Sequence, residues 1–233
     1  MADAISLRYN TWMKPGSKPK GKVKIEWSPE FAYAIGLITT DGCLLNDGRH
    51  IDITSKDRDQ LENILHCLKI KVKIGTKGSG SSKKRYYRVQ FGDVLFYKFL
   101  LAIGLTPAKS RTLGEIDIPK KYFFDFLRGS FDGDGTFYSY YDPRWRSSFM
   151  FYTCFISASE RYIVWIRKEI QKRIHIKGHI NYSGRKKSTL QIKYGKRESL
   201  KILKAMYYSK HKVCLKRKRL KIEKALAIVG LTI

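Results

Sequence analysis

The amino-acid sequence predicts an α+β fold in which one unit of helices and strands occurs twice. A fourteen-residue pattern appears first as FAYAIGLITTDGCL and again as FDFLRGSFDGDGTF. Its central glycines are Gly36 and Gly129, and its aspartates are Asp41 and Asp134. Both pairs are 93 residues apart. Segments with strand and helix periodicity follow both copies in the same order, which indicates a duplicated unit of helix, two strands, helix, two strands and helix.

The elements of the first unit follow from the residues after the first copy. The copy itself has the mixed apolar and small residues of a buried helix that ends at Asp-Gly. The next stretches are predicted as a hairpin, a helix, two basic strands and a helix: LLNDGRHIDITS, RDQLENILHCLKI, KVKIGTK with KRYYRVQF, and DVLFYKFLLAIG. A glycine- and serine-rich turn at 78–82 joins the two basic strands.

The second unit repeats this order after its own helix. The corresponding stretches are TFYSYYDPRWRSSFMFYTCFISAS, RYIVWIRKEIQKRI, IHIKGHINYSG with STLQIKYG, and KRESLKILKAMYY. We therefore predict a basic N-terminal arm over 1–27, a first repeat over 28–113, and a second repeat over 114–233 that ends in a basic helix.

Charge narrows the class of partner. The 233 residues include 47 lysines and arginines against 20 acidic residues, a formal charge of +27. This excess, with 13% aromatic residues, predicts a folded nucleic-acid-binding protein over a disordered basic tail. No apolar stretch is long enough for a membrane span. The four cysteines form no CxxC pair, which predicts free thiols in a reducing intracellular compartment over a zinc site or disulfides.

The helix predicted for each copy ends in an aspartate, at the position where a helix disfavours a negative charge. The C-terminus of a helix carries partial negative charge, so an anion there costs about 0.3–1 kcal/mol. Glycine after a helix commonly ends it by taking left-handed backbone angles, so one Asp-Gly pair would be an ordinary turn. Small residues at i and i+4 lie on one helix face in both copies: Gly36 with Thr40, and Gly129 with Gly133. Parallel packing of these faces would bring Asp41 and Asp134 together, where Mg²⁺ could bind carboxylates and phosphate.

Both copies resemble the LAGLIDADG motif of homing endonucleases. The second, FLRGSFDGDG, is the closer match, whereas the first has Thr39 and Thr40 where the family often has an acid and a small residue. The similarity of layout extends over residues 31–221. The sequence is therefore similar to double-motif, single-chain members of that family.

This resemblance implies a fold and an activity. Each αββαββα repeat would form a four-stranded antiparallel sheet, and the two sheets would form a saddle over double-stranded DNA. A monomer with internal pseudo-two-fold symmetry would cut both strands at a long specific site and leave 3′ overhangs. The implied cofactor is Mg²⁺ or another divalent cation, such as Mn²⁺, or Ca²⁺ in a non-cleaving state.

The resemblance also implies site residues. The last acids of the motifs, and the carbonyls of the residues after them, would bind metal: Asp41, Asp134, Gly42 and Gly135. Asp132 would not share this role, because residues two apart face different directions on a helix. A basic residue is expected near each scissile phosphate. The candidates are Lys109 in GLTPAKS, and Lys218 or Lys216 in CLKRKR, with Lys218 favoured.

Strand alternation predicts which side chains face DNA. The residues expected to read base edges are Tyr86, Arg88, Gln90, Lys177, Asn181, Gln191 and Lys193. Those expected to contact phosphate are Lys71, Lys73, Lys83, Lys84, Arg85 and Arg185–Lys187. The basic C-terminal helix is also expected to contact the DNA backbone. The inward residues of the second pair of strands are predicted as Ile174, Ile176, Ile180, Tyr182, Leu190, Ile192 and Tyr194.

Two other functions fit the composition. A non-cleaving relative on the same scaffold, such as an intron RNA maturase or a DNA-binding regulator, would use the basic sheets without needing the acids. A ribosome-associated basic protein fits the charge, but it leaves the repeated Asp-Gly helices unexplained. Because both motif acids are present, the sequence favours the endonuclease.

Overall fold

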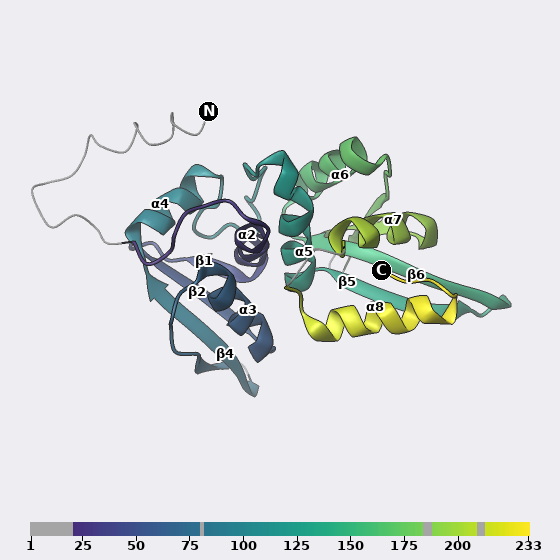
Figure 1. Ribbon diagram of the computed structural model, residues 1–233, viewed down its shortest axis with the longest axis horizontal. Coiled ribbons are helices and arrows are strands. Elements are labelled where there is room, and N and C mark those ends of the chain that lie inside the picture. The colour runs from purple at the N-terminus through teal and green to yellow at the C-terminus, as the bar shows by residue number, and fades with distance from the viewer. Residues whose placement is uncertain (1–20, 80–81, 184–187, 209–212) are drawn as a thin grey trace, which may run out of the picture.

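The computed structural model describes residues 21–79, 82–183, 188–208 and 213–233, and it contains the predicted duplication (Figure 1). The first repeat comprises α2 (Pro29–Asp41), β1 (Gly42–Leu44), β2 (His50–Ser55), α3 (Arg58–Leu68), β3 (Gly75–Ser79), β4 (Ser82–Gly92) and α4 (Val94–Ala102). The second comprises the 3-10 turn η2 (Lys120–Tyr122), α5 (Phe123–Gly133), β5 (Thr136–Asp142), β6 (Trp145–Ser157), α6 (Glu160–Ile174), β7 (His179–Ser183), β8 (Thr189–Tyr194) and α7 (Lys196–Met206). A further helix, α8 (Lys216–Ile228), follows. The predicted α+β fold is confirmed.

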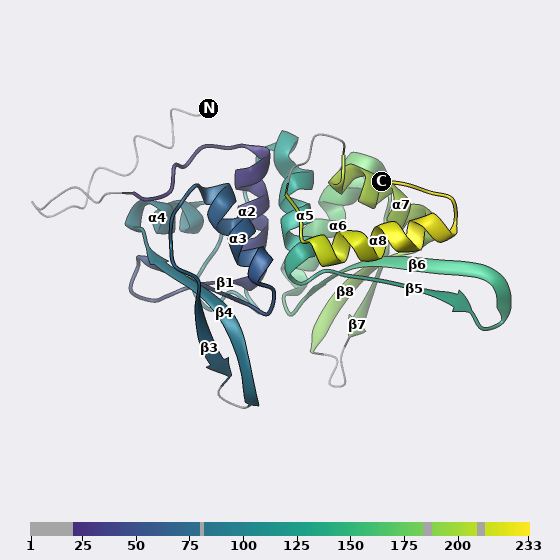
Figure 2. The same cartoon turned by 60° about the horizontal axis from the view of Figure 1, so that its bottom comes forward.

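Each repeat forms one four-stranded antiparallel sheet. The strand order is β1-β2-β4-β3 in the first sheet and β5-β6-β8-β7 in the second sheet. The helices gather on one side of the two sheets, and the opposite side is left open (Figure 2). Alternate strand residues on the helix side, such as Ile53, Val89 and Ile192, are fully buried, which anchors each sheet to its helices.

Helices α2 and α5 pack against each other in parallel at the centre of the molecule (Figure 2). A Cβ added at Gly36 would lie 2.1 Å from the carbonyl oxygen of Phe126. One added at Gly129 would lie 2.1 Å from the carbonyl oxygen of Tyr33. Only glycine permits backbones to approach this closely, so the predicted contact between the two small-residue faces is confirmed.

The glycines after the two motif aspartates have a different role from the one expected. Gly42 is extended, with φ −81° and ψ 149°, and Gly135 does not have a positive φ. A Cβ at Gly42 would lie 2.5 Å from the Ile38 carbonyl oxygen, and one at Gly135 2.4 Å from Cδ2 of Phe131. The chain turns directly from each helix into a strand, so glycine is required by close approach and not by a left-handed conformation.

The predicted limits of two strands are wrong. Strand β3 begins at Gly75, not at Lys71. Ile174 ends α6 instead of starting a strand, and the following His175 has φ 54°. Tyr182, predicted to point inward, is 59% exposed, because it lies on the edge strand of the second sheet where its side chain is not covered.

The described part of the predicted N-terminal arm, residues 21–27, packs on the first repeat. The backbone N–H groups of Lys22 and Val23 donate to Asp93 Oδ2 at 2.6 and 2.9 Å, and Asp93 also caps α4. The rest of the predicted arm, residues 1–20, lies outside the described residues. In the part of the chain that the structure describes, no helix has the length and apolar character needed to cross a membrane.

Candidate active site

The two motif aspartates meet at the ends of the two central helices. Asp41 is the last residue of α2, and Asp134 directly follows α5. A Cβ added at Gly133 would lie 3.2 Å from Asp41 Oδ2, so the Asp41 carboxylate lies against the end of α5. Asp41 is partly buried and Asp134 is exposed, which leaves the pair accessible to a ligand.

The two predicted lysines are buried against the ends of the same helices. Lys109 Nζ donates to the carbonyl oxygen of Gly42. Lys218 Nζ donates to the carbonyl oxygens of Phe131 at 2.5 Å, Gly133 at 3.1 Å and Gly135 at 2.6 Å. The exposed fractions of these lysines are only 7% and 8%. Their ammonium groups therefore offset the negative charge of two helix C-termini and two carboxylates.

Helix α8 delivers Lys218 because contacts from both repeats hold its first turn. Leu215 N donates to Asp132 Oδ2 at 2.7 Å, Asn63 Nδ2 donates to the Cys214 carbonyl at 3.0 Å, and Arg217 makes two hydrogen bonds of 2.8 and 2.6 Å with Asp57. Lys216, the alternative candidate, is exposed. Among the lysines of CLKRKR, the structure thus brings Lys218 to the aspartates.

Asp132 is turned away from the aspartate pair, as expected. Its carboxylate is 1% exposed and accepts hydrogen bonds from Tyr33 Oη at 2.8 Å and from Leu215 N. Because Tyr33 belongs to α2, this acid links the two central helices to the start of α8. Its hydrogen-bond partners are protein groups in the interior, so Asp132 has a structural role.

Gln60 is a site residue that the sequence analysis missed. Its Nε2 donates to Asp41 Oδ2, and its Oε1 accepts a hydrogen bond of 2.7 Å from Ser55 Oγ. Gln60 is only 2% exposed. The sequence pattern could not show this, because Gln60 lies in a helix with many polar residues. These two bonds fix the orientation of the Asp41 carboxylate.

Burial shifts the pKa of every charged group at the site toward its neutral form. Burial first, and the Asp134 charge second, raise the pKa of Asp41 to about 6. Although part of Asp134 is exposed, the surrounding protein partly removes water from its carboxylate, which raises its pKa against the opposing effect of the two lysines. The pKa of Lys109 is lowered by burial, and burial lowers that of Lys218 to about 8. The carboxylates therefore carry negative charge that the protein only partly compensates.

Replacing Asp41 with Asn is expected to stabilise the metal-free protein at alkaline pH. The pKa of Asp41 is about 6 in the folded state and near 4 when unfolded, so ionisation destabilises the fold as pH rises through that interval. Asparagine removes this cost, worth about 1–3 kcal/mol at pH 8, and its advantage should vanish near pH 4. Thermal unfolding in EDTA measures it, with the exposed Asp117→Asn as control. Equal melting temperatures of wild type and D41N at pH 8 would contradict the assigned environment.

The donor set fits a hard divalent cation. Mg²⁺ commonly binds one or two carboxylates and completes its shell with water and phosphate oxygens. Asp41 and Asp134 supply such carboxylates, and the carbonyls of Gly42 and Gly135 lie beside them. No group of three or more His, Cys, Asp or Glu able to hold a metal occurs among residues 21–79, 82–183, 188–208 and 213–233. A softer, all-protein metal cage is therefore not formed by the described residues.

A cavity of about 270 Å³ opens beside this centre. Its lining includes Asp134 and Lys109, together with Thr39 and Thr40. Those threonines donate into their own helix, Thr39 Oγ1 to the Ile35 carbonyl at 2.7 Å and Thr40 Oγ1 to that of Leu37 at 3.0 Å. The first copy thus has threonines where the motif often has an acid, so this wall of the cavity carries no carboxylate. The cavity beside Asp134 has room for water or a phosphate group.

The open face of the first sheet is polar. Arg88 makes two hydrogen bonds with Asp52, at 2.8 and 2.7 Å, and Gln90 on the same face is exposed. Tyr86 is partly exposed. The basic residues expected to contact phosphate, Lys71, Lys73 and Arg85, are exposed. The structure therefore groups the predicted contacts of the first repeat on or beside one sheet.

The open face of the second sheet is aromatic. Tyr138, Tyr140 and Tyr152 stack with ring centroids 5.2–6.4 Å apart, and Lys193 Nζ lies 3.9 Å from the centre of the Tyr152 ring. Asn181 and Gln191 are paired across β7 and β8 and partly exposed. Lys177 is exposed but precedes β7 instead of lying in a strand. The predicted Arg185 lies outside the described residues.

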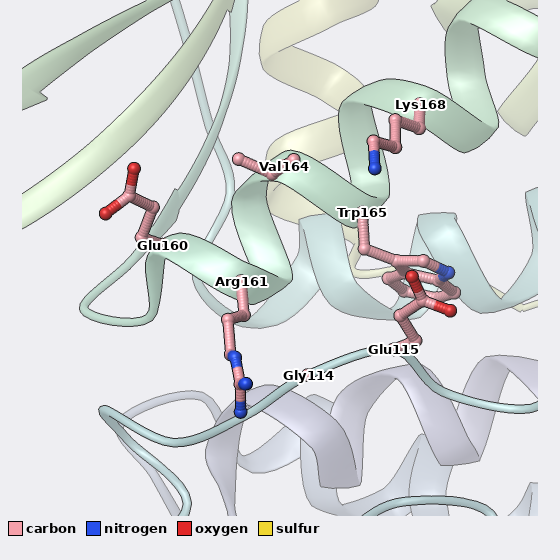
Figure 3. A pocket seen from close by; sticks show the side chains of 7 residues that line it. All are labelled: Gly114, Glu115, Glu160, Arg161, Val164, Trp165 and Lys168. Atoms are coloured by element: carbon pink, nitrogen blue, oxygen red, sulfur yellow. The ribbon is translucent and has the colours of Figure 1, made fainter.

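A second cavity, of about 540 Å³, lies between α6 and the segment 103–119 that joins α4 to η2 (Figure 3). Its lining includes Glu115 from that segment with Arg161, Trp165 and Lys168 from α6. It contains none of the residues predicted for catalysis or DNA contact.

Comparison with known proteins supports the fold. The sequence matches no protein-family model, and no curated protein matches it significantly. Among solved structures, full-length DUF199/WhiA from Thermatoga maritima is similar, with a TM-score of 0.55 and 18% identity over 90% of this chain and 64% of that chain. The chain therefore spans less than two thirds of the length of that protein.

Two homing endonucleases have a similar structure. I-WcaI bound to its DNA recognition sequence gives a TM-score of 0.59 and 12% identity, covering 84% of this chain and 88% of that chain. I-DmoI in complex with DNA and Ca gives 0.53 and 12%, covering 87% and 98%, and I-DmoI in complex with DNA and Mn also matches. At these identities the similarity establishes the fold, which is that of the LAGLIDADG endonuclease structures.

Proposed function

We propose that the protein is a site-specific homing endonuclease that makes double-strand breaks in a long DNA target by divalent-metal-dependent hydrolysis. The observation that carries the proposal is the meeting of Asp41 and Asp134, one from each repeat, between two sheets whose open faces carry the predicted DNA contacts. Structural neighbours bound to DNA, with calcium or manganese in the I-DmoI complexes, support this choice of substrate and cofactor.

The residues of the site have separate parts in the proposed reaction. Asp41 and Asp134 hold the divalent cation, with Gln60 fixing the Asp41 carboxylate. A bound divalent ion would activate water and stabilise the attacking and leaving oxygens of the phosphodiester. Lys109 and Lys218 place positive charge beside the phosphate, and a pKa of about 8 lets Lys218 exchange a proton near neutral pH. The duplicated arrangement would supply one such set for each DNA strand.

A non-cleaving nucleic-acid-binding protein is the second candidate, and one observation favours it. The carbonyls of Gly42 and Gly135, predicted as metal ligands, accept hydrogen bonds from Lys109 and Lys218. A chain whose own lysines occupy these carbonyls could keep this fold without binding metal. Such a protein would bind DNA or intron RNA and leave the bound strand intact.

Selection of cleaved duplexes from a randomised DNA library separates these candidates. With Mg²⁺, the endonuclease should release ends at one position within one enriched sequence, with 3′ overhangs. With EDTA it should release none. A binding protein would enrich uncut duplexes under both conditions, and that result would overturn the proposed activity.

A further inference from the structure

An arginine on the open face of the first sheet is held in one orientation by a neighbouring acid. Arg88 lies on β4 and Asp52 on β2, which pair side by side. Nε of Arg88 donates to Asp52 Oδ1 at 2.8 Å, and Nη2 donates to Oδ2 at 2.7 Å. The two side chains are 32% and 10% exposed, so the carboxylate is largely covered and the guanidinium is partly presented to solvent.

This pairing leaves a defined edge of the guanidinium free for a ligand. Arginine has five N–H donors in a rigid plane, of which Asp52 takes two. The remaining Nη1 and Nη2 donors point along parallel directions at the far end. Guanine presents two acceptors, O6 and N7, side by side in the major groove, and this end of an arginine matches them.

The charge of the pair argues against a phosphate contact. Asp52 neutralises Arg88, and its carboxylate would repel a phosphate brought to the same place. An arginine used only for phosphate attraction gains nothing from such a partner. A base edge carries no net charge. An arginine can therefore recognise it even when a carboxylate partner fixes the guanidinium and neutralises its charge.

The second sheet has no such pair at the pseudo-symmetrically equivalent position. Asp52 is paired in register with Cys43, two residues after Asp41, and Cys154 is paired with Thr136, two residues after Asp134. Cys154 therefore takes the position of Asp52. Gln191, opposite Ile156, takes that of Arg88, which lies opposite Thr54. Asp142 holds Arg144 in the second repeat by the same two hydrogen bonds, but this pair lies at the turn between β5 and β6 and not at the position of Arg88.

We propose that Arg88, oriented by Asp52, reads one guanine in the major groove of the half-site bound by the first repeat. This inference rests on the proposed binding of a specific DNA sequence. It assigns Arg88 as a specificity-determining residue and Asp52 as its positioning residue. The half-site under the second sheet should lack a guanine contact at the symmetry-related position, where Gln191 replaces Arg88.

Binding selection from a randomised duplex library in Ca²⁺ tests the proposal. The double variant Asp52→Asn/Arg88→Gln removes the pair without leaving an unpaired charge. It should lose the preference for guanine at one position by about tenfold to a hundredfold. The salt dependence of its binding should be unchanged, because a neutral pair releases no counterions.

Two further variants distinguish base reading from phosphate contact. Lys77 is exposed on β3, paired with Tyr86 on the same face as Arg88, so Lys77→Gln is a matched control. It should weaken all sequences alike and reduce the slope of log K against log salt by about 0.9. Asp52→Asn alone should free the charge of Arg88, increasing that slope while weakening the guanine preference.

The outcomes separate this inference from the proposed function. If the double variant selects the same motif as the wild type, the role of Arg88 alone is overturned. The same holds if the variant binds all sequences more weakly with a lower salt slope. A wild-type protein that enriches no sequence overturns the sequence-specific function and this inference with it. Matched melting temperatures of the variants confirm that each is folded.

Discussion

Replacing Asp41 or Asp134 with asparagine is expected to abolish double-strand cleavage and to leave DNA binding largely intact. Each carboxylate holds the cation that stabilises the reacting oxygens, and such stabilisation is worth several kcal/mol, or at least about a thousandfold in rate. Asparagine keeps the size of the side chain and an acceptor for Gln60, so the site should remain folded. Rates of cutting on a selected target, measured beside binding affinity in Ca²⁺, give the comparison.

The control for this result is Asp117→Asn, at an exposed aspartate that lies outside both motif copies. It should cut at the wild-type rate. Retention of wild-type cutting of both strands by D41N or D134N would show that these acids do not form the catalytic centre. A parallel loss of affinity would instead show that the substitution had disturbed the DNA-binding surface.

Alanine at Gly36 or Gly129 is expected to destabilise the protein more than any surface substitution. The new Cβ would lie 2.1 Å from a carbonyl oxygen of the facing helix, so the two helices must separate. Overpacking of this kind costs about 3 kcal/mol or more, well above the gain of about 1 kcal/mol in helix propensity. For a chain of this length the melting temperature should fall by about 6–12 °C.

Gly114→Ala is the matched control, because a Cβ there meets no atom within 4 Å. Its melting temperature should equal that of the wild type. If G36A and G129A also melt like the wild type, the close contact of α2 with α5 is not what holds the repeats together. Where these variants remain folded, the displaced aspartates should cut more slowly.

The sequence was sufficient to predict the meeting of the two aspartates. The 93-residue spacing indicated two equivalent helices, and small residues at i and i+4 (Gly36 with Thr40, Gly129 with Gly133) allowed them to pack closely on that face. Lys109 and Lys218 could be proposed only through the resemblance to a known motif. Their burial against helix-end carbonyls depends on a loop and on the anchored start of α8, which are set by contacts between distant residues.

The wrong and missed predictions also result from contacts between residues that are distant in the sequence. Ile174 fits a strand by alternation, but it lies four residues after the buried Ile170 on α6 and packs against the core from that helix. Tyr182 has the alternation of an inward residue, yet an edge strand leaves it uncovered. Gln60 became visible as a site residue only when its two hydrogen bonds, to Ser55 and Asp41, were placed in space.

Anomalous diffraction from crystals of the protein with its selected DNA target and Mn²⁺ would examine the aspartate pair most directly. The proposed site predicts anomalous peaks within coordination distance of Asp41 and Asp134 and of the scissile phosphates. Peaks absent from that position, with DNA bound across the sheets and the ammonium groups of Lys109 and Lys218 still on the glycine carbonyls, would contradict metal-dependent cleavage and leave a DNA-binding protein.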